Sequence, residues 1–546
     1  MKKRLTAAAM ALCLMAPFAT RAQDGAPPAA PLPGWAELEA AGARIGEIRI
    51  SSGEIFDLTN PKEDKWLFRL ANRLHIRTRP NVIERQLLFK PGDRVSVRVL
   101  EETERLLRSN RYLYDVHFRA LAWHDGVVDI EVATRDTWTL DLGASVGRAG
   151  GATTSGIHLR EYNLLGTGTS VSFGRSNRVD RSGNEIEFSN DRAFGTAAAL
   201  RYSHASNTDG RSDAISAQLP FRSLDTRWAA GVSLSNDDRI DAVYSGGDIV
   251  SQYRRRQNQR EVFGGWSTGL QAGWVQRYTI GLRSEEDGYA AEPGFTPPPL
   301  LPDDDKRVGP FVRYDLIEDR FQKAQNRNLV GRPEFFALGL AASVQLGRAA
   351  TGLGSTRNGW QYAASISRGF EPVAGQQLIA AATLSGRRSD GQPQRMAAGL
   401  QAQYYLPQGP RWLFFASAAT GMLKNPDPAE ALQLGGDNGL RGYPQRYQSG
   451  TRRALFTVEE RFYTDIYLWR LFRIGGAAFF DAGRAWGGAG TNLQDAGWLC
   501  NAGVGLRIVS ARAAFSNVLH IDLAFPLGAP ADIKKVQFLV KTKTSF

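Results

Sequence analysis

Most of the chain alternates apolar residues with small or polar ones, the pattern of β-strands that have two different faces. From 138 to 546, segments of about ten residues with this alternation are separated by short polar turns. Within 214–221, for example, Ile215, Ala217 and Leu219 share one face. About twenty such segments can be marked. A soluble β-sandwich alternates likewise, but so many strands favour an all-β transmembrane barrel, which leaves no edge unpaired.

Residues 45–135 have a different character, because charged residues are frequent and the apolar spacing is mixed. The predicted elements are a strand over 45–51, helices over 62–75, 81–89 and 96–107, and strands over 113–121 and 127–133. Ser96 is a candidate N-cap, and His124, Asp125 and Gly126 form the turn between the last two strands. With an insertion near 52–79 set aside, the order β-α-α-β-β predicts one small α/β domain.

The first 22 residues predict export. Lys2, Lys3 and Arg4 precede a short apolar run over 5–18, and Thr20 and Ala22 fit the small-residue positions before a cleavage site. This is the pattern of a secretory signal peptide over 1–22. A Pro/Ala-rich linker and a short helix follow over 23–44, and no later apolar run is long enough for a transmembrane helix.

Composition and charge narrow the class of protein. Apolar residues make up 42% and charged residues 22% of the chain, so it is not a disordered one. The only two cysteines are Cys13 and Cys500, and the six histidines are scattered, so we expect neither a disulfide scaffold nor a metal or other cofactor. The net charge of +12 falls to 12 − 4 = +8 without the four basic residues of 1–22. An exported chain of this charge is not expected to bind nucleic acid.

Five short sequences follow one another in the second part of the chain. They are YNLLGTG at 162–168, LGGDNGLRGY at 434–443, VEERF at 458–462, FFDAGRAW at 479–486 and IDLAFPL at 521–527. Together with FKPGD, ETERLLRSNRYLYDV and DGVVDIEV in the first part, they resemble the BamA/TamA outer-membrane assembly superfamily, also known as the bacterial surface antigen family. The resemblance extends from about residue 45 to residue 546.

The resemblance implies a more definite fold than the alternation alone. It implies a POTRA domain at 45–135 and an outer-membrane β-barrel of sixteen antiparallel strands at 138–546. Some of the alternating segments, among residues 240–430, would then be hairpins in long extracellular loops. The final strand ends in Phe546, which resembles the C-terminal signal that the outer-membrane insertion machinery reads.

The resemblance also implies a loop whose Arg-Gly-aromatic tip, here Arg441, Gly442 and Tyr443, folds back into the barrel lumen. By strand parity Glu459 points inward, and Asp481 lies on the inward face of its own strand. A guanidinium at Arg441 can meet both carboxylates with a bidentate geometry that lysine cannot reproduce. Gly442 would allow a tight turn beside the barrel wall. Because a barrel lumen is wet, we expect breaking this cluster to cost clearly less than breaking a fully buried ion pair.

By resemblance, the protein inserts or translocates polypeptides at the bacterial outer membrane. Its POTRA domain would lie in the periplasm and capture unfolded or nascent outer-membrane and secreted polypeptides, with outer-membrane lipid and accessory periplasmic subunits as further partners. One alternative is a dedicated two-partner secretion pore, and another is a passive porin-like channel or structural surface antigen. The chain contains no HExxH or Walker sequence and no GxSxG nucleophile elbow, since the two GxSxG matches, at 143–147 and 265–269, lie within alternating segments and not between a strand and a helix. We therefore expect no enzyme.

Overall fold

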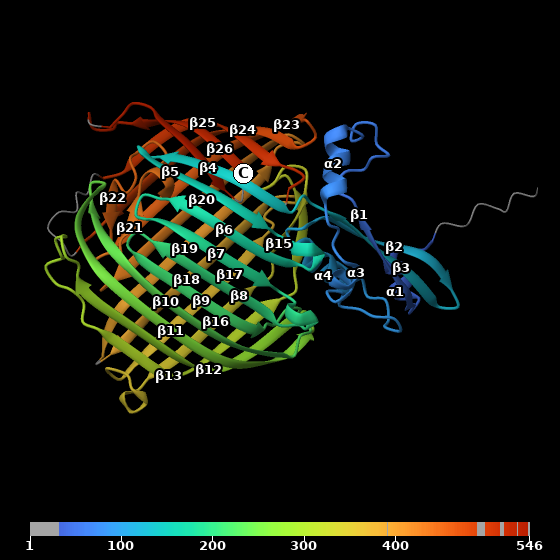
Figure 1. Cartoon of the computed structure of the whole chain (residues 1–546), viewed down its shortest axis with the longest axis horizontal. Helices are drawn as coiled ribbons and strands as arrows, with labels where there is room; N and C mark the ends of the chain where they lie inside the picture. Colours follow the sequence, from blue (N-terminus) through green and yellow to red (C-terminus); the bar gives the residue numbers. More distant parts are fainter. Residues whose placement is uncertain (1–31, 390, 489–496, 514–517, 532, 544–546) are drawn as a thin grey trace, which may run out of the picture.

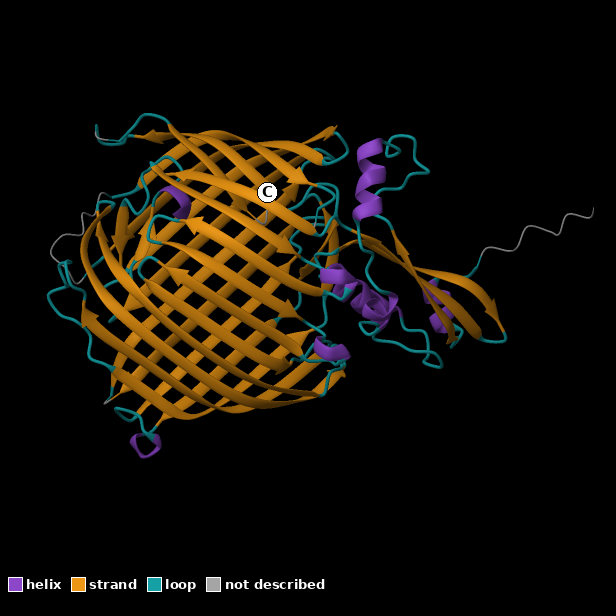
Figure 2. Ribbon diagram, in the orientation of Figure 1, coloured by secondary structure: helices purple, strands orange, loops and turns teal. Residues whose placement is uncertain are grey.

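The computed structural model describes residues 32–389, 391–488, 497–513, 518–531 and 533–543. The predicted signal peptide, most of the linker and Phe546 therefore lie outside the described residues. The described chain consists of a small N-terminal α/β unit and a large β-barrel, which lie side by side in Figures 1 and 2.

The α/β unit has one three-stranded sheet with helices packed against it. Its elements are α1 (Trp35–Ala40), β1 (Arg44–Gly53), α2 (Trp66–Leu74), α3 (Pro80–Glu84), α4 (Val97–Arg108), β2 (Leu113–His124) and β3 (Val127–Asp136). The strand order is β1-β3-β2, with β1 parallel and β2 antiparallel to the central β3. Ile83, Leu107, Val116 and Ile130 lie in its core with almost no exposed surface. The outer edges of β1 and β2 are therefore the two edges of the sheet.

The helices of the unit differ in part from the prediction. Ser96 lies at the N-cap position of α4, but its side chain makes no capping hydrogen bond. The helix predicted over 81–89 is observed only as the short helix α3, because the backbone leaves the helical conformation after Glu84. The insertion at 52–79 contains the separate helix α2, so that the observed order after α1 is β-α-α-α-β-β.

Twenty antiparallel strands close the barrel. They are β4 (Leu140–Ala149), β5 (Ala152–Glu161), β6 (Thr169–Asn177), β7 (Ser182–Asn190), β8 (Ala199–Asn207), β9 (Gly210–Leu219), β10 (Trp228–Ser245), β11 (Asp248–Gln271), β12 (Trp274–Ala291), β13 (Asp305–Glu318), β16 (Ala341–Ala349), β17 (Gly359–Phe370), β18 (Gln377–Ser389), β19 (Gln392–Pro407), β20 (Trp412–Lys424), β23 (Arg452–Leu468), β24 (Phe472–Trp486), β25 (Leu499–Ser510), β26 (Val518–Leu527) and β27 (Gln537–Lys543).

The prediction of sixteen strands is therefore wrong. The resemblance would place some of the alternating segments among 240–430 in extracellular loops. In the structure, strands of this region pair with one another in the barrel wall, from β10–β11 to β19–β20. Their outward rows are apolar and exposed, as at Ile280 and Leu400, so that these strands suit a lipid-facing wall. The alternation itself, which marks about twenty segments, was the better guide to the number of strands.

Two inserts leave the wall and enter the barrel. The hairpin β14 (Phe321–Gln325) and β15 (Pro333–Ala337) lies at the mouth that faces the α/β unit (Figure 1). The loop 425–451, with the short strands β21 (Leu432–Leu434) and β22 (Gln448–Gly450), enters from the opposite mouth. Short 3-10 turns lie at Leu164–Gly166, Ala193–Gly195, Thr351–Leu353 and Gly436–Asn438. Among the described residues, no helix has both the length and the apolar character to cross a membrane.

Candidate functional site

The loop 425–451 is anchored in the lumen by an apolar cluster. Leu434, Leu440 and Tyr443 are almost fully buried and pack with Ala485 and Leu499 of the wall. The loop reverses direction between them by left-handed backbone conformations, with φ of +127° at Gly435 and +110° at Gly439. Because only glycine adopts these angles at low cost, the glycines of the LGGDNGLRGY sequence determine where the tip lies.

Arg441 makes a forked contact with two carboxylates of the wall. Its Nε and Nη2 donate to Oδ2 and Oδ1 of Asp481 on β24 over 2.8 and 2.7 Å, and its Nη1 donates to Oε1 of Glu459 on β23 over 2.8 Å. The structure thus brings together the arginine and both carboxylates of the predicted cluster. We refer to Arg441, Glu459 and Asp481 as the clasp.

The clasp is dry. Asp481 has no exposed side-chain surface, and the side chains of Glu459 and Arg441 are 5% and 8% exposed. The expectation of a wet environment is therefore wrong at this point of the lumen. The reason is that the loop brings Arg441 into contact with both carboxylates, while side chains of the wall also donate to them. Electrostatic contacts are consequently stronger here than in an open lumen.

Gly442 and Tyr443 hold the tip against the last strands. The Gly442 amide donates to Oδ1 of Asn501 over 3.1 Å, and a Cβ at position 442 would lie 2.6 Å from the Cβ of Asn501. Gly442 lies, as predicted, in a tight turn beside the barrel wall, which the Tyr443 amide closes by donating to the Leu440 carbonyl oxygen over 3.2 Å. The absence of a side chain also allows the close approach to β25. The Tyr443 hydroxyl donates to the carbonyl oxygens of Cys500 and Leu527 over 3.1 and 3.4 Å.

Further residues around the clasp were not predicted as members of the site. The Arg441 guanidinium lies 3.4 Å from the ring centroid of Phe479, and the Asn501 amide donates to Asp481 over 2.9 Å. Arg461 donates to Oε2 of Glu459 over 2.9 Å, so this carboxylate is shared between two arginines. Strand parity identifies Phe479, which lies two residues before Asp481, but no local pattern in the sequence marks Asn501.

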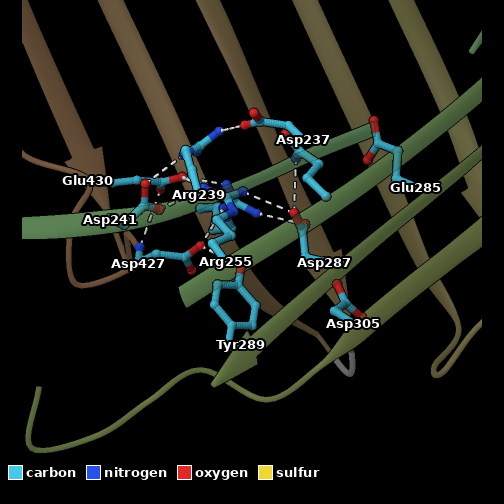
Figure 3. A network of polar contacts seen from close by, with 12 residues as sticks. Asp237, Arg239, Asp241, Arg255, Glu285, Asp287, Tyr289, Asp305, Asp427 and Glu430 are labelled. Atoms are coloured by element: carbon cyan, nitrogen blue, oxygen red, sulfur yellow. Dashed lines mark hydrogen bonds and ion pairs between the residues drawn. The ribbon is translucent and has the colours of Figure 1, made fainter. Parts of the chain in front are cut away.

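The same loop is also fixed to the opposite wall, as Figure 3 shows. The Tyr289 hydroxyl donates to Oδ2 of Asp427 over 2.7 Å, and Arg395 donates to Glu430. Arg255 donates to Asp287 over 3.0 Å and lies 3.8 Å from Glu430. These partners come from β11, β12 and β19, so the loop bridges two distant parts of the wall.

The hairpin β14–β15 contacts both the barrel wall and the α/β unit. On the side of the barrel, Nη1 of Arg461 donates to the carbonyl oxygen of Arg327 over 2.9 Å. On the side of the unit, Nζ of Lys323 donates to Glu104 of α4 over 3.0 Å, and the Arg105 guanidinium lies 4.1 Å from the ring centroid of Phe321. The hairpin therefore contacts α4 with one strand and Arg461, a neighbour of the clasp, with its loop.

A second contact between unit and barrel involves a buried carboxylate of α4. Glu102 accepts a hydrogen bond from the Leu224 amide, between β9 and β10, over 2.7 Å and one from Arg98 over 3.0 Å. Burial raises the pKa of the Glu102 carboxyl, and these hydrogen-bond donors act against that shift. Helix α4 is thus attached to the rim of the barrel at two places.

The barrel closes between its last and first strands at a weak seam. Among the described residues β27 and β4 pair at one position only, Val540 with Arg148. By contrast, β4 and β5 pair along their whole length, from Leu140 with Glu161 to Ala149 with Ala152. The clasp lies on the inner side of the strands that lead to this seam.

The chemistry of the site is that of an ion-pair lock. Among the residues that the structure describes, no group of His, Cys, Asp or Glu side chains is placed to hold a metal ion. The predicted C-terminal signal at Phe546 cannot be placed, since that residue lies outside the described ranges.

Solved structures that resemble this chain are distant from it in sequence. One is BamA from Haemophilus ducreyi lacking POTRA domains 1-3, with 11% identity, a TM-score of 0.40 and coverage of 92% of this chain and 85% of that one. Two others are CdiB from Acinetobacter baumannii and from Escherichia coli, with 14% and 13% identity, TM-scores of 0.46 and 0.49, and coverage of 92% of this chain in each case and 73% and 76% of theirs. No curated protein matches this chain.

The family is shown by the sequence of the barrel. Residues 163–546, well over half of the chain, match the Omp85 superfamily domain. This range contains the clasp, both inserts and all but the first two strands of the closed barrel. The chain is a member of the Omp85 superfamily, whose fold here is an outer-membrane β-barrel preceded by a small α/β unit.

Proposed function

We propose that this protein inserts or translocates polypeptides at the bacterial outer membrane. In this proposal residues 138–546 span the membrane, and residues 45–135 form a POTRA domain in the periplasm that receives unfolded or nascent polypeptides. The clasp, which consists of Arg441, Glu459 and Asp481, holds the C-terminal strands in the shape from which the seam opens. No cofactor takes part, so the free energy comes from folding of the client and from strain in the bilayer beside the seam.

The single observation that carries the proposal is the seam between β27 and β4. Among the described residues, one paired position, Val540 with Arg148, closes a barrel whose other neighbouring strands are joined by longer ladders. Each backbone group left unpaired in lipid is costly, which makes this edge the one that gains most from pairing with another strand. A client strand that adds to β4 would satisfy it.

The α/β unit offers edges of the same kind to a client before it reaches the barrel. Its sheet ends on β1 and β2, and an extended polypeptide can add to either edge by main-chain hydrogen bonds. Such pairing depends little on sequence, which suits the capture of many clients. The hairpin β14–β15 contacts both α4, through Lys323, and Arg461, the neighbour of the clasp, so it is placed to connect that event to Glu459.

A two-partner-type secretion pore is the second candidate, and one observation favours it. The lumen beside β7–β12 contains a cavity of about 610 Å³ lined by polar side chains such as Ser203, Ser233, Gln259 and Glu261. A barrel of twenty strands is wide enough for an aqueous channel, so an extended polypeptide could pass along this wall. A passive porin is less well supported, because two inserts occupy the lumen and one of them binds the α/β unit.

A disulfide across the seam tests the proposal and separates the two candidates. In a Cys500→Ala background, Arg148→Cys with Val540→Cys joins β4 to β27, while Val146→Cys with Ser155→Cys joins β4 to β5 as the matched control. Client insertion into vesicles should stop in the oxidised seam variant, recover after reduction, and proceed in the control. Unchanged insertion with a fully locked seam would refute the seam as the route, and secretion that continues under the lock would identify the lumen.

A further inference from the structure

Helix α2 has an apolar face that nothing in the described structure covers. Trp66, Leu67, Leu70 and Leu74 are 67%, 55%, 40% and 62% exposed, and we refer to these four residues as the α2 outer face. The opposite side of the helix is buried, where Phe68 stacks on another aromatic ring of the insertion 52–79. The fold of the insertion therefore does not depend on the outer face.

The helix lies directly beneath the seam of the barrel. On one side of the seam, Arg512 after β25 donates to Glu63, just before α2, over 2.6 Å. On the other side, Asn163 after β5 donates to Thr78, just after α2, over 2.8 Å. The segment that contains α2 thus bridges both sides of the β27–β4 closure, and Figure 1 shows the helix beside the rim of the barrel.

The outer face continues the lipid-facing surface of the barrel. Ile466 near the end of β23 and Trp469 in the turn that follows are 54% and 66% exposed, and Leu471 of that turn packs against the cluster beneath α2. Exposed tryptophans also lie at this end of the barrel at Trp228 and Trp412. Such rings mark the level at which a barrel leaves the hydrocarbon region, so α2 lies at the level of the membrane surface.

The charges beside the outer face fit an anionic surface. Arg69 and Arg73 follow one flank of α2, Lys65 precedes it, and the helix contains no acidic residue. Arg69 forms an ion pair with Asp64 over 3.0 Å, which leaves Lys65 and Arg73 without an acidic partner within the insertion. Basic residues beside an apolar face with tryptophan are typical of helices that lie in the plane of a membrane interface.

We propose that α2 is an interfacial helix, with its outer face on the acyl chains and its arginines at the anionic phospholipid headgroups of the leaflet that faces the α/β unit. This inference rests on the membrane embedding in the proposed function, and adds that lipid is a direct partner of the insertion 52–79. The helix would hold the unit against the membrane and disturb lipid packing at the place where the seam opens.

Depth-dependent quenching tests this inference on the full chain. In a Cys500→Ala background, single cysteines at Leu70, at Arg119 of β2 and at Leu142 of β4 carry an NBD fluorophore, and the protein is reconstituted into phosphatidylethanolamine–phosphatidylglycerol vesicles with a nitroxide-labelled lipid. Arg119 is exposed and belongs to the same unit, while Leu142 is 81% exposed on the barrel wall. We expect strong quenching at 142 and 70 and little at 119.

The outcomes separate the inference from the proposed function. If position 142 is quenched but position 70 is quenched no more than position 119, the interfacial helix is overturned while the barrel remains in the membrane. If position 142 is not quenched, the embedding of the barrel itself is overturned. Leu67→Asp, an exposed change that leaves the buried side of α2 intact, should bring the quenching at 70 down to that at 119. Crosslinking of position 70 to a second copy or to a polypeptide, without quenching, would also overturn lipid as the occupant.

Discussion

Replacement of Arg441 tests the clasp most sharply, because the structure allows the cost to be worked out. Arg441→Ala removes three hydrogen bonds to two carboxylates that are almost fully buried. Glu459 retains Arg461, but among the described residues Asp481 retains only the neutral donors Thr457 and Asn501. Breaking a buried pair in this way costs about 3–5 kcal/mol. The population of the open loop should therefore increase by a factor that lies between about a hundred and several thousand.

Hydrogen exchange of the peptide that covers 434–447 measures this opening, since its amides, such as that of Gly442, are bonded in the closed loop. Arg441→Lys should behave almost like Arg441→Ala, because an ammonium cannot reproduce the fork to Asp481. Arg446→Ala is the matched control, as Arg446 belongs to the same loop and pairs with the partly exposed Asp180. Because Asp180 is 44% exposed, loss of this pair should cost clearly less than loss of the buried clasp. Equal exchange in the Arg441 and Arg446 variants would refute the reasoning.

Three further predictions follow from the ends, the edges and the inserts of the chain. Deletion of Phe546 should slow insertion of the barrel, seen as less heat-modifiable protein in the membrane; unchanged amounts would count against a C-terminal signal. The amides of Phe118 and Arg119 point to opposite sides of β2, so proline at one of these two positions removes an amide from the free edge without disturbing the pairing with β3. That variant should fold and lose client capture. Normal capture by both proline variants would contradict β-augmentation. Replacement of 321–337 by a short Gly/Ser turn should raise ion conductance in planar bilayers, because a barrel of this width conducts once its mouth is open; unchanged conductance would show that the hairpin does not close it.

The strands and the clasp could be predicted because their signals are local. Alternation with period 2 marks the wall strands one by one, and parity assigns Glu459 and Asp481 to the lumen before any contact is known. The position of Arg441 came from the motif alone. The number of strands in the family was a poorer guide than the alternation, because strands can be added to a barrel in pairs while its closing contacts remain the same.

What could not be predicted depends on contacts between distant segments. The hairpin β14–β15 has strands of five residues, too short for a clear period, and its place in the mouth is set by Arg461, more than a hundred residues later. A helix over 62–75 was predicted, but its exposed apolar side was not, since a helical period shows that a face is apolar and not what covers it. The dryness of the clasp likewise arises only when the loop folds over it.

The central claim, that the chain handles polypeptides, is tested most directly by crosslinking in living cells. Photoreactive residues placed one at a time along the outer edges of β1 and β2, for example at Arg49 and Arg119, report what touches the sheet while the protein works in its own membrane. The account predicts adducts with unfolded outer-membrane or secreted polypeptides, and their loss in the edge-proline variant that still folds. A folded, membrane-embedded protein that yields no polypeptide adduct from any position on either edge would contradict it.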